Sequence, residues 1–160
     1  MPIRLVHDLV STAPVAGGTR HVLAIGRAGE AARIPALLLV PDAPARAPAA
    51  LLLHGFSSRK EQMAESIGAA LLAHGIASLA IDLPLHGARI AEGAATSWGM
   101  AGGHPRAVDG RAMRNPLALA SAWREAQRDA KLALGYLGAR GEVDRARLAV
   151  VGYSMGSFLG

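Results

Sequence analysis

The sequence has 160 residues, of which 51% are hydrophobic and 18% charged, and it carries a formal net charge of +5. This composition is typical of one packed globular domain and excludes a disordered chain. Because cysteine is absent, disulfides, a thiol nucleophile and thiolate metal sites are excluded.

The positive charge does not indicate a nucleic-acid partner. The basic residues are scattered arginines, lysine occurs only at Lys60 and Lys131, and aromatic residues do not alternate with the arginines. No apolar run reaches the roughly 18 residues of a membrane-spanning helix, and the first residues carry no secretory signal. We therefore expect a cytoplasmic protein with neither a membrane nor a nucleic-acid partner.

The first part of the chain predicts a β-hairpin after an N-terminal extension over residues 1–19. Val22–Ile25 and Ile34–Val40 are apolar runs, and a glycine-containing turn at Gly26–Glu30 joins them. The segment Pro41–Pro48 contains three prolines and predicts a loop.

A change of periodicity predicts a βαβ unit next. Ala49–Leu53 is wholly apolar, as expected for a strand that is buried on both faces of a parallel sheet. Ser58 and Glu61 have the spacing of a capping box and predict a helix that stops at Gly75. Ile76–Ile81 is a second buried strand, so the crossover between the strands is expected to be right-handed.

Residues 83–116 are rich in glycine and lack a sustained period, which predicts a loop or partial cap over a site. Asn115 followed by Pro116 predicts the start of an amphipathic helix that ends near Gly138. Its apolar stripe consists of Leu119, Trp123, Ala126, Ala130, Leu134 and Leu137. Leu148–Val151 is a third buried strand, and no second domain is predicted.

The strongest motif comes directly after that strand, where Gly152-Tyr153-Ser154-Met155-Gly156 matches the pattern G-x-S-x-G. Gly152 and Gly156 allow a sharp strand-to-helix turn that exposes the serine hydroxyl at the end of the strand. Ser154 is therefore a candidate nucleophile, and the Met155 amide is a candidate donor to an oxyanion. The alternative interpretation is a glycine-rich turn whose serine only caps a helix.

Two further loops come after the two parallel strands. His54-Gly55-Phe56 offers the Phe56 amide as a second oxyanion donor, and Gly55 permits the backbone geometry. We expect His54 to shape this loop through hydrogen bonds, because its position does not provide the separate base of a triad. Asp82 and His86 are expected to fix the second loop in the same way.

Together these motifs resemble the α/β-hydrolase superfamily, in particular its serine esterase and dienelactone-hydrolase-like branch, from about residue 20 to the end. The loops come after three buried strands in the family's order, and Asp144 and Arg145 precede the last strand as often occurs in that branch. The resemblance implies an α/β fold with a mostly parallel sheet and flanking helices, and no metal or cofactor. It also implies hydrolysis of a small carboxylic ester through an acyl-enzyme on Ser154, with the amides of Phe56 and Met155 as the oxyanion hole.

The chain departs from the family after Ser154. A serine nucleophile needs a general base and an orienting carboxylate, in the family order Ser, Asp or Glu, then His. None of the six residues after Ser154 is Asp, Glu or His. We therefore expect residues 1–160 to be the N-terminal part of a single α/β-hydrolase domain, truncated after the nucleophile elbow. A missing C-terminal segment or a second chain would supply the base and carboxylate, with His104 and His86 as upstream alternatives for the base.

Two other functions share part of this pattern. A non-catalytic α/β-hydrolase-like binding or scaffolding domain would account for the missing Asp and His. A Rossmann nucleotide-binding domain shares the βαβ unit, but no G-x-G-x-x-G comes after the first parallel strand. The loop 83–116 is expected to line the acyl pocket, with Trp98 and Met100 as candidate contacts.

Overall fold

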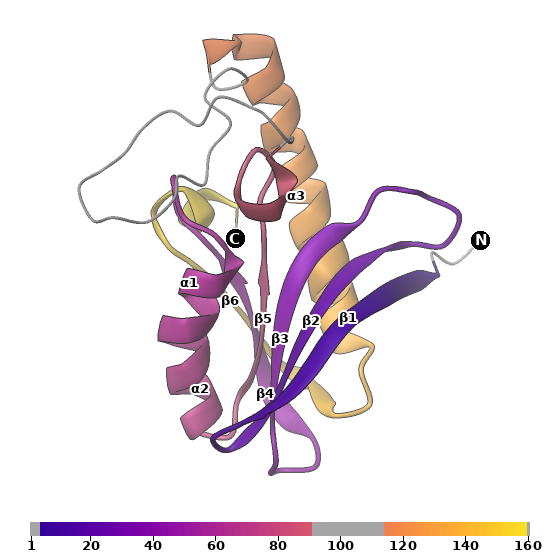
Figure 1. Cartoon of the computed structure of the whole chain (residues 1–160), viewed down its shortest axis with the longest axis vertical. Helices are drawn as coiled ribbons and strands as arrows, with labels where there is room; N and C mark the ends of the chain where they lie inside the picture. The colour runs from indigo at the N-terminus through magenta and orange to yellow at the C-terminus, as the bar shows by residue number, and fades with distance from the viewer. Residues whose placement is uncertain (1–3, 91–113, 160) are drawn as a thin grey trace.

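The computed structural model describes residues 4–90 and 114–159. In these residues, six strands form one sheet in the order β1-β2-β3-β5-β4-β6 (Figure 1). The strands are β1 Leu5–Val15, β2 Gly18–Arg27, β3 Ile34–Pro41, β4 Ala47–Leu53, β5 Ala77–Ile81 and β6 Val143–Gly152. Strands β1, β2, β3 and β5 pair antiparallel, whereas β4 runs parallel to both β5 and β6. The carboxyl ends of β4, β5 and β6 therefore meet at one edge of the sheet.

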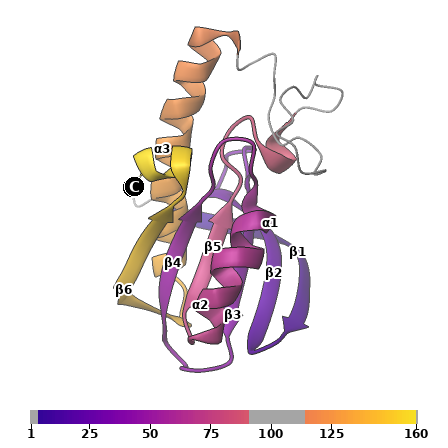
Figure 2. The same ribbon diagram turned by 90° about the vertical axis from the view of Figure 1, so that its left-hand side faces the viewer.

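Helices cover both faces of the sheet (Figure 2). The helix between β4 and β5 consists of α1 Lys60–Met63, a π-helical turn η1 Ala64–Gly68, and α2 Ala69–Ala73. The long helix α3 Pro116–Gly138 covers the opposite face. Short 3₁₀ turns come after two of the strands, η2 Gly87–Arg89 after β5 and η4 Ser154–Phe158 after β6.

Two hydrophobic cores lie on the two faces of the sheet, because successive side chains of a strand point in opposite directions. In β4, Leu51 and Leu53 join the core that includes Leu137 of α3. Leu52 belongs to the other core, which includes Leu72 of α2. Each fully buried leucine contributes about 1.5–3 kcal/mol. The prediction that Ala49–Leu53 is a strand buried on both faces is thus confirmed.

The predicted βαβ unit is also confirmed, since β4 and β5 are parallel and α1, η1 and α2 lie between them in sequence. Gly75 ends this helix with φ +70, a left-handed conformation that glycine adopts at little cost. The predicted capping box is wrong, because Ser58 Oγ donates to Gln62 Oε1 at 2.7 Å and Arg59 occupies the N-cap position. The Lys60 amide donates instead to Asp82 Oδ1 at 2.9 Å, so the cap comes from the loop after β5.

The N-terminal extension predicted over residues 1–19 is a strand over much of its length. Residues 5–15 form β1, which pairs with β2 from Leu5 opposite Arg27 to Val15 opposite Gly18. Most of β1 is exposed, so it lacks the apolar alternation by which a strand is found in a sequence. The predicted loop over 41–48 is shorter than expected, because β4 begins at Ala47.

The start of α3 is confirmed, since Asn115 Oδ1 accepts from the amides of Leu117 and Ala118 at 3.0 and 3.4 Å and Pro116 is the first helical residue. The predicted apolar stripe is only partly buried: Leu119 is exposed, while Asp129 and Tyr136 are buried on the face that packs against the sheet.

Strand β6 differs from its prediction as a buried strand. It is the edge strand of the described sheet, paired only with β4, and Val150 is 40% exposed. The apolar sequence of residues 148–151 predicts a strand but does not indicate whether that strand lies at the centre or at the edge of the sheet.

Of the predicted loop or partial cap over 83–116, residues 91–113 lie outside the described part of the chain, and so do Trp98, Met100 and His104. Over the ranges 4–90 and 114–159, no helix is long and apolar enough to cross a membrane.

Candidate active site

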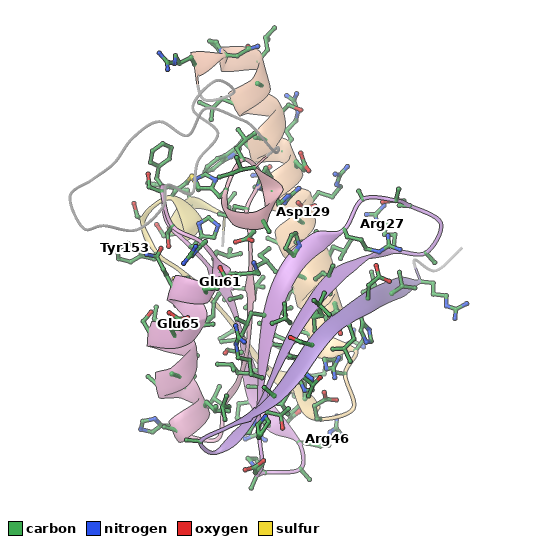
Figure 3. The ribbon with its side chains drawn as sticks, viewed as in Figure 1. Arg27, Arg46, Glu61, Glu65, Asp129 and Tyr153 are labelled. Carbon is green, nitrogen blue, oxygen red and sulfur yellow. The ribbon has the colours of Figure 1, made fainter. Side chains whose placement is uncertain are left out.

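Ser154 occupies a strained turn at the end of β6. Its φ is +49, in the left-handed region that residues other than glycine rarely adopt. The preceding residue, Tyr153, donates its amide to the carbonyl oxygen of Leu53 at 3.0 Å, and its side chain projects outward from the end of β6 (Figure 3). Ser154 is itself exposed. Ser154 thus lies in a sharp turn between a strand and a helical turn, the backbone arrangement that the G-x-S-x-G motif predicts.

The two glycines of the motif leave no room for side chains. A Cβ atom on Gly152 would lie 2.5 Å from the carbonyl carbon of Gly156. A Cβ atom on Gly156 would lie 2.2 Å from the carbonyl oxygen of Leu53 in β4. Both separations are far below a van der Waals contact with backbone, so the tightness of the turn depends on glycine at both positions.

The loop after β4 runs directly beside Ser154. A Cβ atom on Gly55 would lie 3.0 Å from Tyr153 Cδ1 and 3.2 Å from Ser154 Cβ. The loop then turns sharply, with Ser58 N donating to the carbonyl oxygen of Gly55 at 3.2 Å. Within the described residues, the amide of Phe56 donates no hydrogen bond. The loop that lies against the serine turn therefore carries an unused N–H group one residue after its closest approach.

His54 links the loops after β4 and β5. Its Nε2 accepts from the amide of Leu83 at 3.0 Å, so the proton lies on Nδ1, which donates to the carbonyl oxygen of Gly55 at 2.7 Å. Burial lowers the pKa of His54 to about 4. The ring is therefore neutral at pH 7, and neither nitrogen is available to accept a proton from Ser154.

Asp82 is a fully buried carboxylate that holds several groups around it. Its Oδ2 accepts from Lys60 Nζ at 2.8 Å and from the amide of Ala88 at 3.0 Å. Gly87, with φ +54, lets the chain wrap closely around this carboxylate. Burial disfavours the ammonium of Lys60, but hydrogen bonds to Asp82 and Glu61 outweigh burial and raise the pKa of Lys60. Asp82 thus joins the loop after β5 to the start of α1.

His86 lies in the same buried cluster. Its Nδ1 donates to the carbonyl oxygen of Pro84 at 2.8 Å, and its Nε2 has no hydrogen-bond partner among the described residues. The ring lies 5.1 Å from that of His54 and 5.7 Å from that of Phe56, measured between centroids. Burial lowers the pKa of His86. Neither ring nitrogen bonds to Ser154, so the structure brings His86 to the loop after β4 rather than to the serine hydroxyl.

Arg89 ties this region to α3. Its Nη1 donates to Asp129 Oδ2 at 2.7 Å and to the carbonyl oxygen of Asp82 at 3.2 Å, and its Nη2 pairs with Glu125. Figure 3 shows Asp129 on the α3 side of the site. Burial raises the pKa of Asp129 in spite of the neighbouring guanidinium. From the sequence, Arg89 is expected to pair with a carboxylate in its own loop, and the structure gives it two carboxylates of α3 instead.

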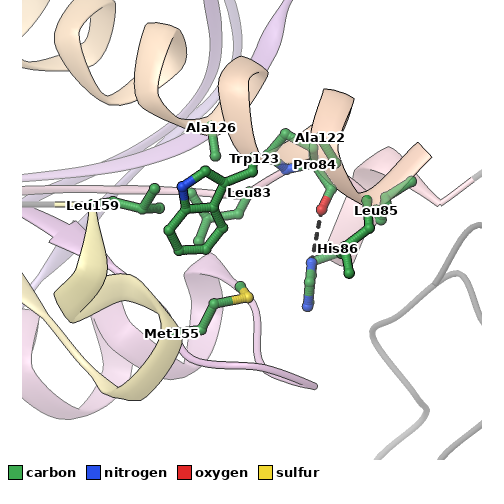
Figure 4. Close-up of a pocket in the computed structure, with 10 residues that line it drawn as sticks. Leu83, Pro84, Leu85, His86, Ala122, Trp123, Ala126, Met155 and Leu159 are labelled. Carbon is green, nitrogen blue, oxygen red and sulfur yellow. Dashed lines mark hydrogen bonds between the residues drawn. The ribbon is translucent and has the colours of Figure 1, made fainter. Parts of the chain in front are cut away.

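A small apolar cavity of about 30 Å³ lies beside the elbow (Figure 4). Its walls come from the loop after β5, from α3 and from η4, and include Leu83, His86, Trp123, Ala126, Met155 and Leu159. The sequence had placed Trp123 in the apolar stripe of α3, and the structure adds that it lines this cavity. Across the described ranges, no cluster of three or more His, Cys, Asp or Glu side chains is arranged to hold a metal ion.

The parallel strands and the strained serine turn define an α/β hydrolase, as predicted. The profile of the Alpha/beta hydrolase family matches residues 50–160, and the chain belongs to this family. A search with the sequence found no match among curated proteins.

Solved structures support the same fold. Acetyl xylan esterase 1 from Thermoanaerobacterium sp. JW/SL YS485 superposes with a TM-score of 0.64 at 22% identity, over 99% of this chain and 47% of the esterase. A putative acetyl xylan esterase from Bacteroides fragilis gives 0.74 at 14% identity, over 96% and 43%. An esterase from an Arctic intertidal metagenomic library gives 0.62 at 18% identity, over 100% and 58%. The chain thus spans about half the length of the structures it matches.

Proposed function

We propose that this chain supplies the nucleophile and the oxyanion hole of a serine hydrolase that acts on carboxylic esters. The observation that carries the proposal is the strained, exposed Ser154 in a tight turn between two glycines, packed against the loop in which the Phe56 amide is free. Membership of the family and the likeness to solved esterases support the same chemistry.

In the proposed reaction, Ser154 Oγ bonds to the ester carbonyl carbon while the amides of Phe56 and Met155 stabilise the negative oxygen. The carbonyl–alkoxy bond then breaks, and the Ser154 proton passes through a general base to the departing alcohol. Water next attacks the acyl-enzyme, so that the carboxylic acid leaves and Oγ regains a proton. His54 is neutral and fully hydrogen-bonded, and no ring nitrogen of His86 bonds to Ser154. We therefore assign the base and its carboxylate to a further segment or a second chain, with His104 as the alternative base within residues 1–160.

The cavity beside Met155 is proposed to receive the acyl group. It is apolar and adjoins the residue whose amide would bind the oxyanion. A cavity of about 30 Å³ favours a short acyl chain, which agrees with the acetyl esters named for two of the similar structures.

Mass spectrometry after incubation with p-nitrophenyl acetate tests the proposal. Acylation and deacylation both use the base, but p-nitrophenolate leaves readily without a proton. On prolonged incubation the 160-residue chain should therefore slowly accumulate an acetyl group on the peptide that contains Ser154, with negligible turnover. Ser154→Ala should abolish this adduct. Ser121→Ala, at an exposed serine of α3, should keep it and is the matched control, whereas the Ser157 hydroxyl donates to the carbonyl oxygen of Ser154 and is left unchanged.

Two outcomes would contradict the proposal. Absence of any adduct on Ser154 would favour the non-catalytic binding or scaffolding domain. Rapid Ser154-dependent turnover by the 160-residue chain alone would show that the base lies within it.

A further inference from the structure

A second hollow lies away from Ser154, between the paired ends of β1 and β2 and the helix α3. Its volume is about 270 Å³, and it is lined by Leu5, Arg27, Arg128, Lys131, Leu132 and Gly135. Leu5 and Arg27 face each other across the two strands, and the other four residues belong to α3. Figure 3 shows Arg27 at the end of β2. No lining residue is shared with the cavity beside Met155.

The hollow is strongly positive, since half of its lining residues are cations and none is acidic. Arg27 reaches Glu30 only at 3.7 Å. Arg128 reaches Asp129 only at 3.9 Å, and that carboxylate is already bound by Arg89 at 2.7 Å. Charge-assisted hydrogen bonds are about 2.7–2.9 Å long, so both long pairs neutralise little charge.

Lys131 makes no ion pair or hydrogen bond with any residue that the structure describes. A concave surface that carries several cations concentrates positive potential and attracts anions.

Gly135 keeps one wall of the hollow open. It lies inside α3, where glycine costs about 1 kcal/mol relative to alanine. Close packing does not require glycine here, because an added Cβ atom would meet only Leu5 Cδ1 within 4 Å, at an ordinary 3.7 Å. What glycine provides at this position is therefore open space next to the apolar side chain of Leu5.

We propose that this hollow binds a small organic anion, a carboxylate with a short aliphatic chain. The carboxylate would face Arg27, Arg128 and Lys131, and the chain would lie against Leu5 and Leu132. The volume of about 270 Å³ is at the small end of ligand pockets, which span about 300–1,000 Å³. A molecule of a few carbon atoms fits this space, whereas a dinucleotide does not.

Titration of the ¹⁵N-labelled chain with hexanoate, followed at the amides of Leu132 and Gly135, tests the proposal. Saturable shifts at these amides are expected. Three compounds should bind several-fold more weakly: hexan-1-ol has no charge, hexylammonium has the opposite charge, and inorganic phosphate has no aliphatic chain. Equal shifts with hexylammonium, or shifts confined to residues around Met155, would overturn the proposal.

Substitutions can test separately whether binding needs the positive charge of the hollow and whether it needs the open space. Lys131→Gln should weaken hexanoate binding about threefold, as expected for one exposed charge, and added salt should weaken it further. Gly135→Leu retains every charge but fills the hollow, so it should abolish binding while circular dichroism shows an intact helix. Arg124→Gln removes a cation of α3 that does not line the hollow, and it should bind like the wild type. Two results would contradict the proposal: Gly135→Leu binds hexanoate as well as the wild type, or Arg124→Gln weakens binding as much as Lys131→Gln. Either would show that hexanoate is attracted nonspecifically by positive charge.

Discussion

The loops after β4 and β5 and the turn after β6 meet at the same edge of the sheet, yet they are built in opposite ways. His54 and Asp82 are fully buried, and hydrogen bonds satisfy their polar atoms. Ser154 is exposed, and its backbone is strained. Its turn can be this tight only because the neighbouring glycines have no side chains that would clash with the backbone. The comparison indicates that two buried, hydrogen-bonded loops lie against one exposed turn that holds backbone strain.

The largest effect is expected from Asp82→Ala, which removes one partner of the buried pair with Lys60. Glu61 would still pair with Lys60, but the amides of Lys60 and Ala88 would lose their acceptor. Because breaking a buried ion pair typically costs about 3–5 kcal/mol, we expect a loss in this range in the free energy of unfolding, measured with urea. Asp144→Ala is the control, because that carboxylate pairs with Arg147 at the surface. It should leave the unfolding midpoint almost unchanged, and equal losses would remove the distinction between the two regions.

The next largest effect is a loss of folding stability at acidic pH. The folded pKa of His54 is about 4, below its ordinary value of 6.5, so folding favours the neutral ring. The resulting stability is fully present above pH 6.5 and is lost as the pH falls from 6.5 towards 4, by about 3 kcal/mol in total. Unfolding measured from pH 7.5 to 4.5 should therefore show a steeper decline for the wild type than for His54→Asn. Parallel curves would contradict the assignment.

A smaller loss is expected from Gly156→Ala, which tests the elbow directly. The new Cβ atom would lie 2.2 Å from the carbonyl oxygen of Leu53, so the turn must shift, at a cost of about 1–3 kcal/mol. Acylation of Ser154 should fall with it. Gly141→Ala, where nothing lies within 4 Å of the added atom, is the matched control and should be nearly neutral.

The smallest effect has the opposite sign. Ser154→Gly should stabilise the protein by about 1 kcal/mol, because glycine adopts a positive φ without strain. The same change should abolish acylation. Ser157→Gly, at a position without positive φ, should not stabilise. A loss of stability in Ser154→Gly would show that the serine side chain, and not the backbone, holds the turn.

Much of the fold could be predicted from local pattern. The buried strands, the helix stop at Gly75 and the Asn115 cap depend on residues close in sequence, so their signals are readable. The turn around Ser154 is encoded by a short motif for the same reason. Strand β1 was missed because an exposed strand shows no alternation.

The interactions that join the site could not be predicted in the same way. Asp82, and not Ser58, caps the helix after β4, and it lies 22 residues from Lys60 in sequence. Arg89 and Asp129 are 40 residues apart. Such pairs depend on which elements the sheet topology brings together, and the spacing of residues in a short stretch of sequence does not indicate that topology.

The hydrogen bonds of Arg89 affect where the chain can tolerate changes in length. Together with Asp82 it connects the start of α1, the loop after β5 and the helix α3, and Asn115 independently caps that helix. These anchors lie on both sides of residues 91–113, so exchange of that segment for one of another length should leave the unfolding midpoint nearly unchanged. A large drop in the midpoint would show otherwise. Arg89 and Asn115 thus fix the chain on either side of the segment, so evolution or design can change its length without rebuilding the framework around Ser154.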